Sequence, residues 1–170
     1  MKSRQTGFTI VELLIVIVVI GILAAITVVA YNGIQNRAND TAVTSDLTNV
    51  AKQIMLYNIK EGSFPKGSIQ LAQLDIVLSK SAYSRGMFNG TSWYNVVYCW
   101  PNSANPSTFA IIAQSQSGNV FEAKNGSTKQ VPYELTGSVE TCSSAGIALE
   151  TGNDRDWFYD YDNWRPYVEG

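Results

Sequence analysis

An apolar run over residues 8–30 constrains this chain more than any other feature. At about 1.5 Å per residue, a helix of this length extends roughly 35 Å, whereas the hydrocarbon core of a bilayer is about 30 Å thick. The run contains one charged residue, Glu12, and follows a leader that carries Lys2 and Arg4. It therefore predicts a membrane-spanning helix whose basic amino terminus lies in the cytoplasm. A carboxylate inside such a helix indicates a functional site.

Three simpler interpretations compete with a specialised membrane helix. A secretory signal peptide has an apolar core of roughly 7–15 residues before a small-residue cleavage site. Residues 28–30 would suit as that site, but this run is longer and carries an acid. A plain single-pass anchor explains the length and the basic leader, but not the Gly7-Phe8 pair or Glu12. The core helix of a soluble protein needs neither this length nor this purity.

The order of residues in this segment resembles the type IV prepilin signature, also called a class III signal peptide. The resemblance rests on Gly7, Phe8, Glu12 and the stretch 21–31. It implies that a dedicated membrane peptidase cleaves after Gly7 and N-methylates Phe8, and that Glu12 stays in the mature subunit. The chain departs from the pattern at Val29, where many members have proline. The loosening of the helix that accompanies this proline in the family's filaments is therefore not carried over.

Glu12 has an evident partner once the leader is removed. The new α-amine of Phe8 would be mostly cationic at neutral pH and would lie about one helical turn away. The two charges can pair within one chain, where the helix dipole also favours the acid. Alternatively, Glu12 of an incoming subunit pairs with the Phe8 amine of an assembled one and sets the register, because a misplaced subunit leaves an unpaired charge in apolar surroundings. A third interpretation is that Glu12 only reaches the cytoplasmic headgroups.

Composition offers little support for catalysis or for nucleic-acid binding. The chain has 12 basic and 14 acidic residues, so removal of Lys2 and Arg4 leaves 10 against 14, a side-chain charge of −4. This charge gives no electrostatic reason to bind nucleic acid. The sequence contains no histidine, no metal-ligand spacing, no glycine-rich phosphate loop and no nucleophile-elbow motif. We therefore expect a protein that is not an enzyme and that needs no metal or cofactor.

The apolar helix is expected to continue outside the membrane. An apolar stripe at helical spacing follows it. Its members are Val43, Leu47, Val50, Ile54 and Tyr57. Gly62 is a candidate helix C-cap, and Pro65 prevents the helix from resuming. The predicted organisation is a leader over 1–7, a transmembrane and filament-core helix over 8–30, its amphipathic outer half over 31–62, and a globular head over 63–170.

The head is predicted to be rich in β-structure. Strands are expected at 93–100, 108–116, 120–124 and 130–135, with a tight hairpin at 115–119 and a further short strand at 139–142. A short helix is expected within 68–83. The fold class is therefore α+β, with a long N-terminal helix packed against a small antiparallel sheet, which matches the pilin head in outline.

Cys99 and Cys142 are the only cysteines. In an extracellular domain, two cysteines are most simply explained by a disulfide. It would close a loop of about 44 residues and stabilise the head by roughly 4 kcal/mol in the chain-entropy model. Because many residues follow Cys142, the bridge is expected to span the sheet. Reduced cysteines remain the alternative.

The C-terminal tail combines aromatic residues with aspartates over 154–167. Clustered aromatic side chains with polar groups are typical of binding surfaces, so this segment is a candidate adhesive or inter-subunit face. Its candidate residues are Trp157, Tyr159, Tyr161 and Trp164. The alternative is a last strand or an irregular segment whose aromatics pack on the sheet, with the aspartates outside. The aspartates would suit calcium, but their order does not fit an EF-hand loop.

The resemblance implies a structural subunit of a type IV pilus-like surface filament that serves adhesion, motility or DNA uptake. Its expected partners are further copies of itself, the prepilin peptidase, and the assembly platform with its ATPase. It would reside in the cytoplasmic (inner) membrane as a precursor and at the cell surface after assembly. Two alternatives stay open. One is a pseudopilin of a type II secretion or competence system, and the other is a membrane-tethered extracellular binding module.

Overall fold

The chain divides into two compact units, residues 1–36 and 37–170. Its structure is a computed structural model. The residues that it describes are 7, 9–66, 70–71, 73–74, 76–84, 86–88, 92–94, 96–100, 108–136, 138–147 and 157–158.

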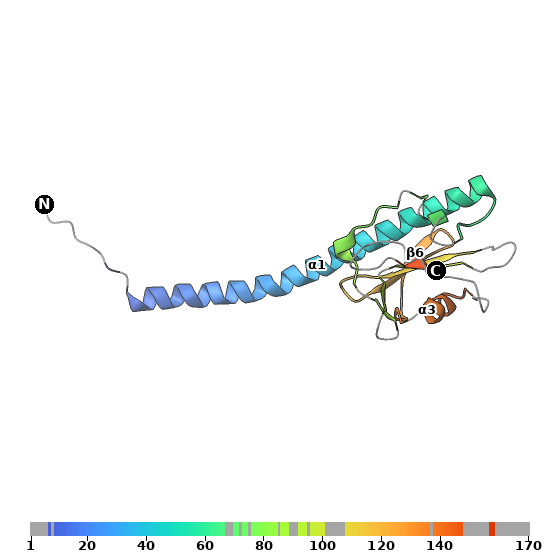
Figure 1. Cartoon of the computed structure of the whole chain (residues 1–170). Helices are drawn as coiled ribbons and strands as arrows, with labels where there is room; N and C mark the ends of the chain where they lie inside the picture. Colours follow the sequence, from blue (N-terminus) through green and yellow to red (C-terminus); the bar gives the residue numbers. More distant parts are fainter. Residues whose placement is uncertain are drawn as a thin grey trace. The chain divides into compact units, whose positions relative to one another are not determined.

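One helix, α1 (Ile10–Glu61), contains both the apolar run and the amphipathic stripe (Figure 1). Val43, Leu47 and Ile54 are fully buried, which confirms the stripe, and Tyr57 at its end is half-buried. The helix ends where predicted. Gly62 adopts a φ of 75°, and its N–H donates to the carbonyl of Asn58 at 2.9 Å. Glycine tolerates this left-handed conformation, so Gly62 terminates α1.

A five-stranded antiparallel sheet forms the centre of the second unit, in the order β6-β5-β4-β3-β7. The strands are β3 (Val96–Cys99), β4 (Ala110–Gln114), β5 (Val120–Lys124), β6 (Ser127–Val131) and β7 (Trp157–Phe158). A separate two-stranded sheet pairs β1 (Gly86–Phe88) with β2 (Ser92–Tyr94). The turn between β4 and β5 confirms the predicted hairpin, because the N–H of Ser115 donates to the carbonyl of Asn119 at 2.9 Å.

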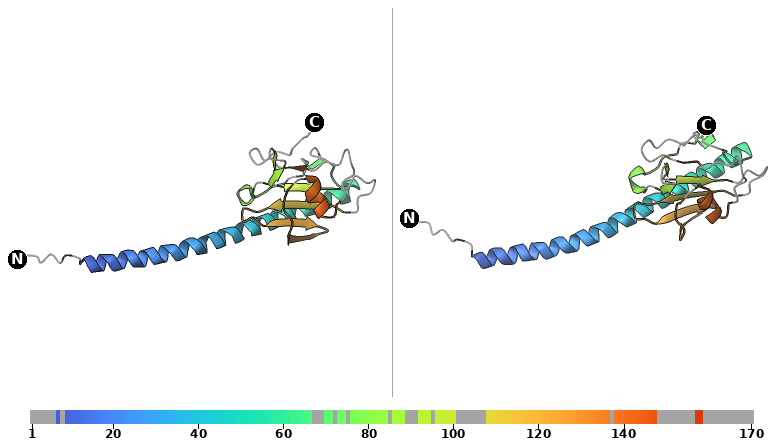
Figure 2. Two further views of the ribbon diagram at one scale, coloured as in Figure 1. Left: turned by 90° about the horizontal axis from the view of Figure 1, so that it is seen from below. Right: turned by 60° about the horizontal axis from the view of Figure 1, so that its bottom comes forward.

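Hydrophobic cores lie on both faces of the sheet. The inner core packs α1 against residues such as Tyr98 and Phe121, and the outer core packs α3 (Ser138–Ser144) against Val97 and Ile112. Figure 2 shows the two helices on opposite sides of the strands. Successive strand residues point to opposite faces, so each central strand serves both cores. The α+β architecture with an antiparallel sheet packed on the long helix is therefore confirmed.

Several predicted boundaries in the head are wrong. The strand expected at 139–142 is the helix α3, and the segment 93–100 contains two strands that belong to different sheets. The strand expected at 130–135 is β6, which begins earlier and ends before Pro132, because proline cannot donate to a strand ladder. The helix expected within 68–83 lies partly outside the described residues, and its described part includes the 3₁₀ turn η1 (Lys80–Ala82).

Asp46 is a buried carboxylate that joins α1 to the segment after it. Its Oδ2 accepts hydrogen bonds from the N–H of Ser79 at 2.6 Å and from the hydroxyl of Tyr83 at 3.0 Å. We expect Asp46→Ala to lower the free energy of unfolding by about 2–3 kcal/mol, because hydrogen bonds to a buried charge are lost. Urea unfolding of the detergent-solubilised chain measures this loss. The exposed neighbour Ser45 supplies the control Ser45→Ala, and equal stability of Asp46→Ala and this control would contradict the prediction.

Asp40 joins α1 to the β4–β5 turn. It accepts hydrogen bonds from the Ser117 hydroxyl and from the side-chain amide of Asn119, the latter at 2.9 Å. Partial burial acts to raise the pKa of Asp40, but hydrogen bonds from Ser117, Ser115 and Asn119 outweigh it and lower the pKa below its ordinary value of 3.8. A lowered folded-state pKa contributes stability that is present above pH 3.8 and is lost as the pH falls through the folded-state value.

We therefore expect Asp40→Asn to be less stable than the wild type at neutral pH. The difference should shrink as the pH falls below 3.8, because the wild-type carboxylate becomes protonated. Urea unfolding at about pH 7 and about pH 2.5 tests this dependence, with Glu140→Gln on an exposed site as the control. A stability difference that is the same at both pH values would contradict the prediction.

Candidate assembly site at the amino terminus

Glu12 lies in a hydrogen-bonded cap at the start of α1. The N–H and the hydroxyl of Thr9 donate to its Oε2 at 2.8 Å and 2.7 Å, and the N–H of Glu12 donates back to the Thr9 hydroxyl at 3.2 Å. This reciprocal arrangement is a capping box, which satisfies N–H groups that have no partner within the helix. Both contacts to the carboxylate use Oε2, so Oε1 takes no part in the cap.

Thr9 is absent from the predicted site residues, although the sequence contains a motif that predicts its role. The residues from Thr9 to Glu12 read Thr-Ile-Val-Glu ahead of an apolar run, which is the sequence signature of a capping box. The predictions for Glu12 considered the α-amine of Phe8, the helix dipole and the cytoplasmic headgroups, but not Thr9. The structure adds that Thr9 holds this carboxylate beside the helix start.

Gly7 is exposed and lies just before the cap. A Cβ atom added at Gly7 would meet no other atom within 4 Å, so the fold does not require glycine at this position. A requirement for glycine there would have to come from another molecule, as the predicted peptidase cleavage implies. Phe8, the predicted methylation site, lies outside the described residues, and both roles remain predictions.

The described side chains of the apolar part of α1 are exposed all around the helix. Leu13, Leu14, Ile15 and Val16 follow one another around a full helical turn, and each is 52–62% exposed. This helix is the one candidate membrane span in the described part of the chain, with a mean hydropathy of 3.3 over 18 residues. An apolar surface of this extent indicates contact with a membrane or with other protein.

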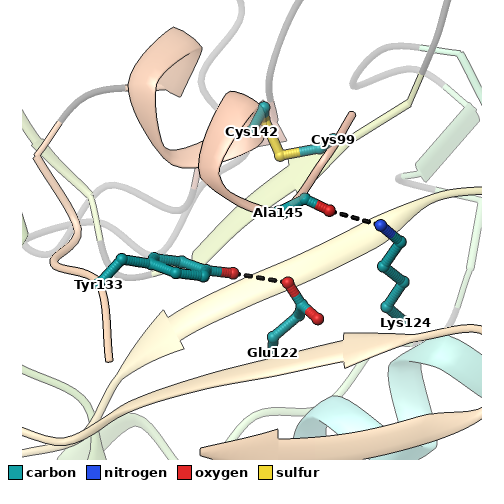
Figure 3. The surroundings of a disulfide bond; sticks show 6 residues. All are labelled: Cys99, Glu122, Lys124, Tyr133, Cys142 and Ala145. Atoms are coloured by element: carbon teal, nitrogen blue, oxygen red, sulfur yellow. Dashed lines mark hydrogen bonds between the residues drawn. A yellow bond between two sulfur atoms is a disulfide. The ribbon is translucent and has the colours of Figure 1, made fainter. Parts of the chain in front are cut away.

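The remaining predicted site residues lie in the head. Cys99 on β3 and Cys142 on α3 form a disulfide with a Cα–Cα distance of 5.5 Å (Figure 3). The bridge therefore fastens α3 to the outer face and does not link strand to strand, which corrects the expectation that it spans the sheet. The backbone of Trp157 belongs to β7, in agreement with the strand alternative for the tail. Tyr159, Tyr161, Trp164 and the side chain of Trp157 lie outside the described residues.

Comparison with known proteins points to the same amino-terminal segment. A family profile described as the prokaryotic N-terminal methylation motif matches residues 2–28. The type IV wide pilus major component PilA4 of Thermus thermophilus is 35% identical over 102 residues, which cover 52% of this chain and 78% of that protein. The type II secretion system core protein G of Klebsiella pneumoniae is 26% identical over 118 residues, which cover 69% and 81%. The type IV major fimbrial protein FimA of Dichelobacter nodosus is 42% identical over 64 residues, which cover 36% and 41%.

A methylation-motif amino terminus, a long first helix and an antiparallel sheet packed on its second half together define a pilin-like protein. The similarity to PilA4 extends well past the amino-terminal motif and over most of that relative. The chain belongs to the type IV pilin family.

Proposed function

We propose that this protein is a structural subunit of a type IV pilus-like surface filament and has no catalytic role. The observation that carries this proposal is the apolar segment of α1, whose described side chains are exposed in a single chain. A membrane would cover this segment in the precursor, with the amino terminus in the cytoplasm. The same segments of neighbouring subunits would cover it in the filament.

The capping box and the end of α1 support the proposed division of the chain into four parts. Residues 1–7 form the leader, 8–30 the filament core, 31–62 the outer half of α1, and 63–170 the head at the filament surface. The peptidase would cleave after Gly7 and methylate Phe8, and the assembly platform and its ATPase would then insert the subunit. In this proposal, Glu12 pairs with the α-amine of an assembled subunit and so sets the register.

The first measurement is the intact mass and the amino-terminal residue of the protein recovered from the surface of its native cell. We expect a chain that begins at Phe8 and is heavier by one methyl group. A chain that begins at Tyr31 would indicate an ordinary secreted domain and contradict the proposal. Retention of Met1 would contradict processing and favour a tethered protein.

A pseudopilin is the second candidate, because the similarity to core protein G covers 69% of this chain against 52% for PilA4. A pseudopilin would serve a type II secretion or competence system. Filaments that sediment from sheared cells support the pilus. Loss of secretion or of DNA uptake on gene deletion, in cells without visible fibres, supports the pseudopilin. If neither occurs, a membrane-tethered binding module that uses the aromatic tail is the remaining interpretation.

A further inference from the structure

A groove of about 580 Å³ opens on the outer face of the head, between the β5–β6 hairpin and the end of α3. Its polar lining includes Lys124, Asn125, Ser127, Lys129 and Tyr133. The backbone register places Lys124 opposite Ser127 and Glu122 opposite Lys129. The two lysines therefore lie in neighbouring cross-strand pairs on the same face of the hairpin. Figure 3 shows Lys124 and Tyr133 on either side of Glu122.

The charges of this groove leave a positive excess. The side chain of Glu122 is 5% exposed, accepts a hydrogen bond from the Tyr133 hydroxyl at 2.6 Å and lies 3.8 Å from the Lys129 ammonium group. Burial and the contact with Glu122 raise the pKa of Tyr133, so its hydroxyl remains a donor. Among the described residues, Lys124 donates a hydrogen bond to the neutral carbonyl of Ala145. Two lysines against one glutamate give the groove a charge of +1, which favours an acidic occupant.

The groove lies beside the β6 edge of the sheet. Among the described strands, β6 pairs with β5 alone, whereas β7 lies at the opposite edge beyond β3. Four strand spacings of about 4.8 Å separate the two edges by roughly 19 Å. β7 runs from Trp157, opposite Tyr98, to Phe158, opposite Val97. Cys99, Ala110 and Lys124 lie opposite one another on β3, β4 and β5. The direction of β7 leads away from this row of residues, and so away from Lys124 in the groove.

The residues after β7 have the chemistry that suits the groove. Residues 159–162 read Tyr-Asp-Tyr-Asp and carry no basic side chain. In an extended conformation, alternate residues point to opposite faces, so both aspartates would lie on one side and both tyrosines on the other. Because β7 lies at the edge opposite the groove and runs away from the row that contains Lys124, a second copy supplies residues 159–162 more readily than the same chain does.

We propose that residues 159–162 of one subunit dock in the groove beside β6 of a neighbouring copy, with Asp160 and Asp162 facing Lys124 and Lys129. The contact joins two different patches, one at each edge of the same sheet, and such heterologous contacts form open helical assemblies when the rotation between copies does not close a ring. This inference rests on the proposed filament function, for which it names an inter-subunit contact of the heads.

The test is zero-length carbodiimide crosslinking of native filaments, which joins lysines to carboxylates that are in contact. We expect a crosslinked dimer in which a peptide with Lys124 or Lys129 is joined to one with Asp160 or Asp162. The dimer should be lost in the double variant Asp160→Asn with Asp162→Asn. The matched control, Asp154→Asn with Asp156→Asn, removes the same charge before β7 and should retain it.

A second pair of variants tests the same charge interaction by changing a residue that lines the groove. Ser127 is exposed in β6, so Ser127→Glu should weaken the filaments by repulsion, and the added change Asp160→Lys should restore them. Wild-type filaments without this crosslink, or with the crosslink only within single chains, would overturn the docking but leave the filament function intact. A wild-type protein that forms no filaments would overturn both proposals.

Discussion

Replacing Glu12 with alanine is expected to leave leader cleavage intact but to abolish filaments recovered from sheared cells. The proposed cleavage site lies before Glu12 in the chain, so processing should continue. Without the carboxylate, an incoming subunit would lose the proposed partner for the α-amine of its neighbour and also the Oε2 atom that accepts two bonds from Thr9. Intact mass of the membrane fraction measures processing, and electron microscopy of the sheared fraction measures assembly.

Two conservative variants separate the roles of Glu12. Glu12→Gln keeps an oxygen that can accept from the Thr9 N–H, since glutamine also serves in capping boxes, but it removes the charge. If register depends on charge, this variant should assemble poorly, whereas Glu12→Asp should retain part of the assembly. Normal filaments from Glu12→Ala would contradict the register proposal. Normal filaments from Glu12→Gln would show that the cap, and not the charge, is what assembly needs.

The second large effect is expected from loss of the disulfide. Cys142→Ser should lower the free energy of unfolding of the head by about 4 kcal/mol, because a crosslink over a sequence separation of 43 residues restricts the unfolded chain. In the folded state, the same bridge fastens α3 over the fully buried side chains of Val97 and Ile112. Urea unfolding with and without a thiol reductant measures the effect on the full chain.

The reductant also provides the control for this experiment. The wild type should lose about as much stability on reduction as the Cys142→Ser variant loses by substitution, and the variant itself should not respond. The pair Cys99→Ala with Cys142→Ala removes both thiols and tests whether an unpaired Cys99 adds an effect. A wild type that is equally stable in both conditions would contradict the assigned role of the bridge.

Local patterns in the sequence predict part of this fold well. The apolar spacing from Val43 to Ile54 and the left-handed preference of Gly62 act within single helical turns, so they locate the buried stripe and the helix end. The β4–β5 hairpin is predicted for the same reason, because its turn needs only nearby residues. At the amino terminus, the residues from Thr9 to Glu12 carry a complete capping signal that the prediction did not use.

The errors in the head arise where distant residues decide the structure. Val139 and Thr141 are β-branched and favour a strand, but their segment forms α3, which the bridge from Cys142 to Cys99 fastens to the sheet. Helix α3 ends at Ser144, and Gly146 follows with a φ of 71°, while the N–H of Ile147 donates to the carbonyl of Cys142 at 2.9 Å. The pairing of β7 with β3 likewise joins segments that are far apart in the sequence, so the local residue pattern of neither segment predicts it.

The two cores of the head draw on alternate residues of the same strands. In β5, Phe121 and Ala123 face α1, whereas Val120 faces the layer that contains α3. The backbone of the sheet is shared, but the side chains of the two layers are separate. Substitutions on the outer layer can therefore reshape the exterior of the head without changing the residues that hold α1. A subunit built in this way can change the outer surface of its head while the packing of the head on α1 stays the same.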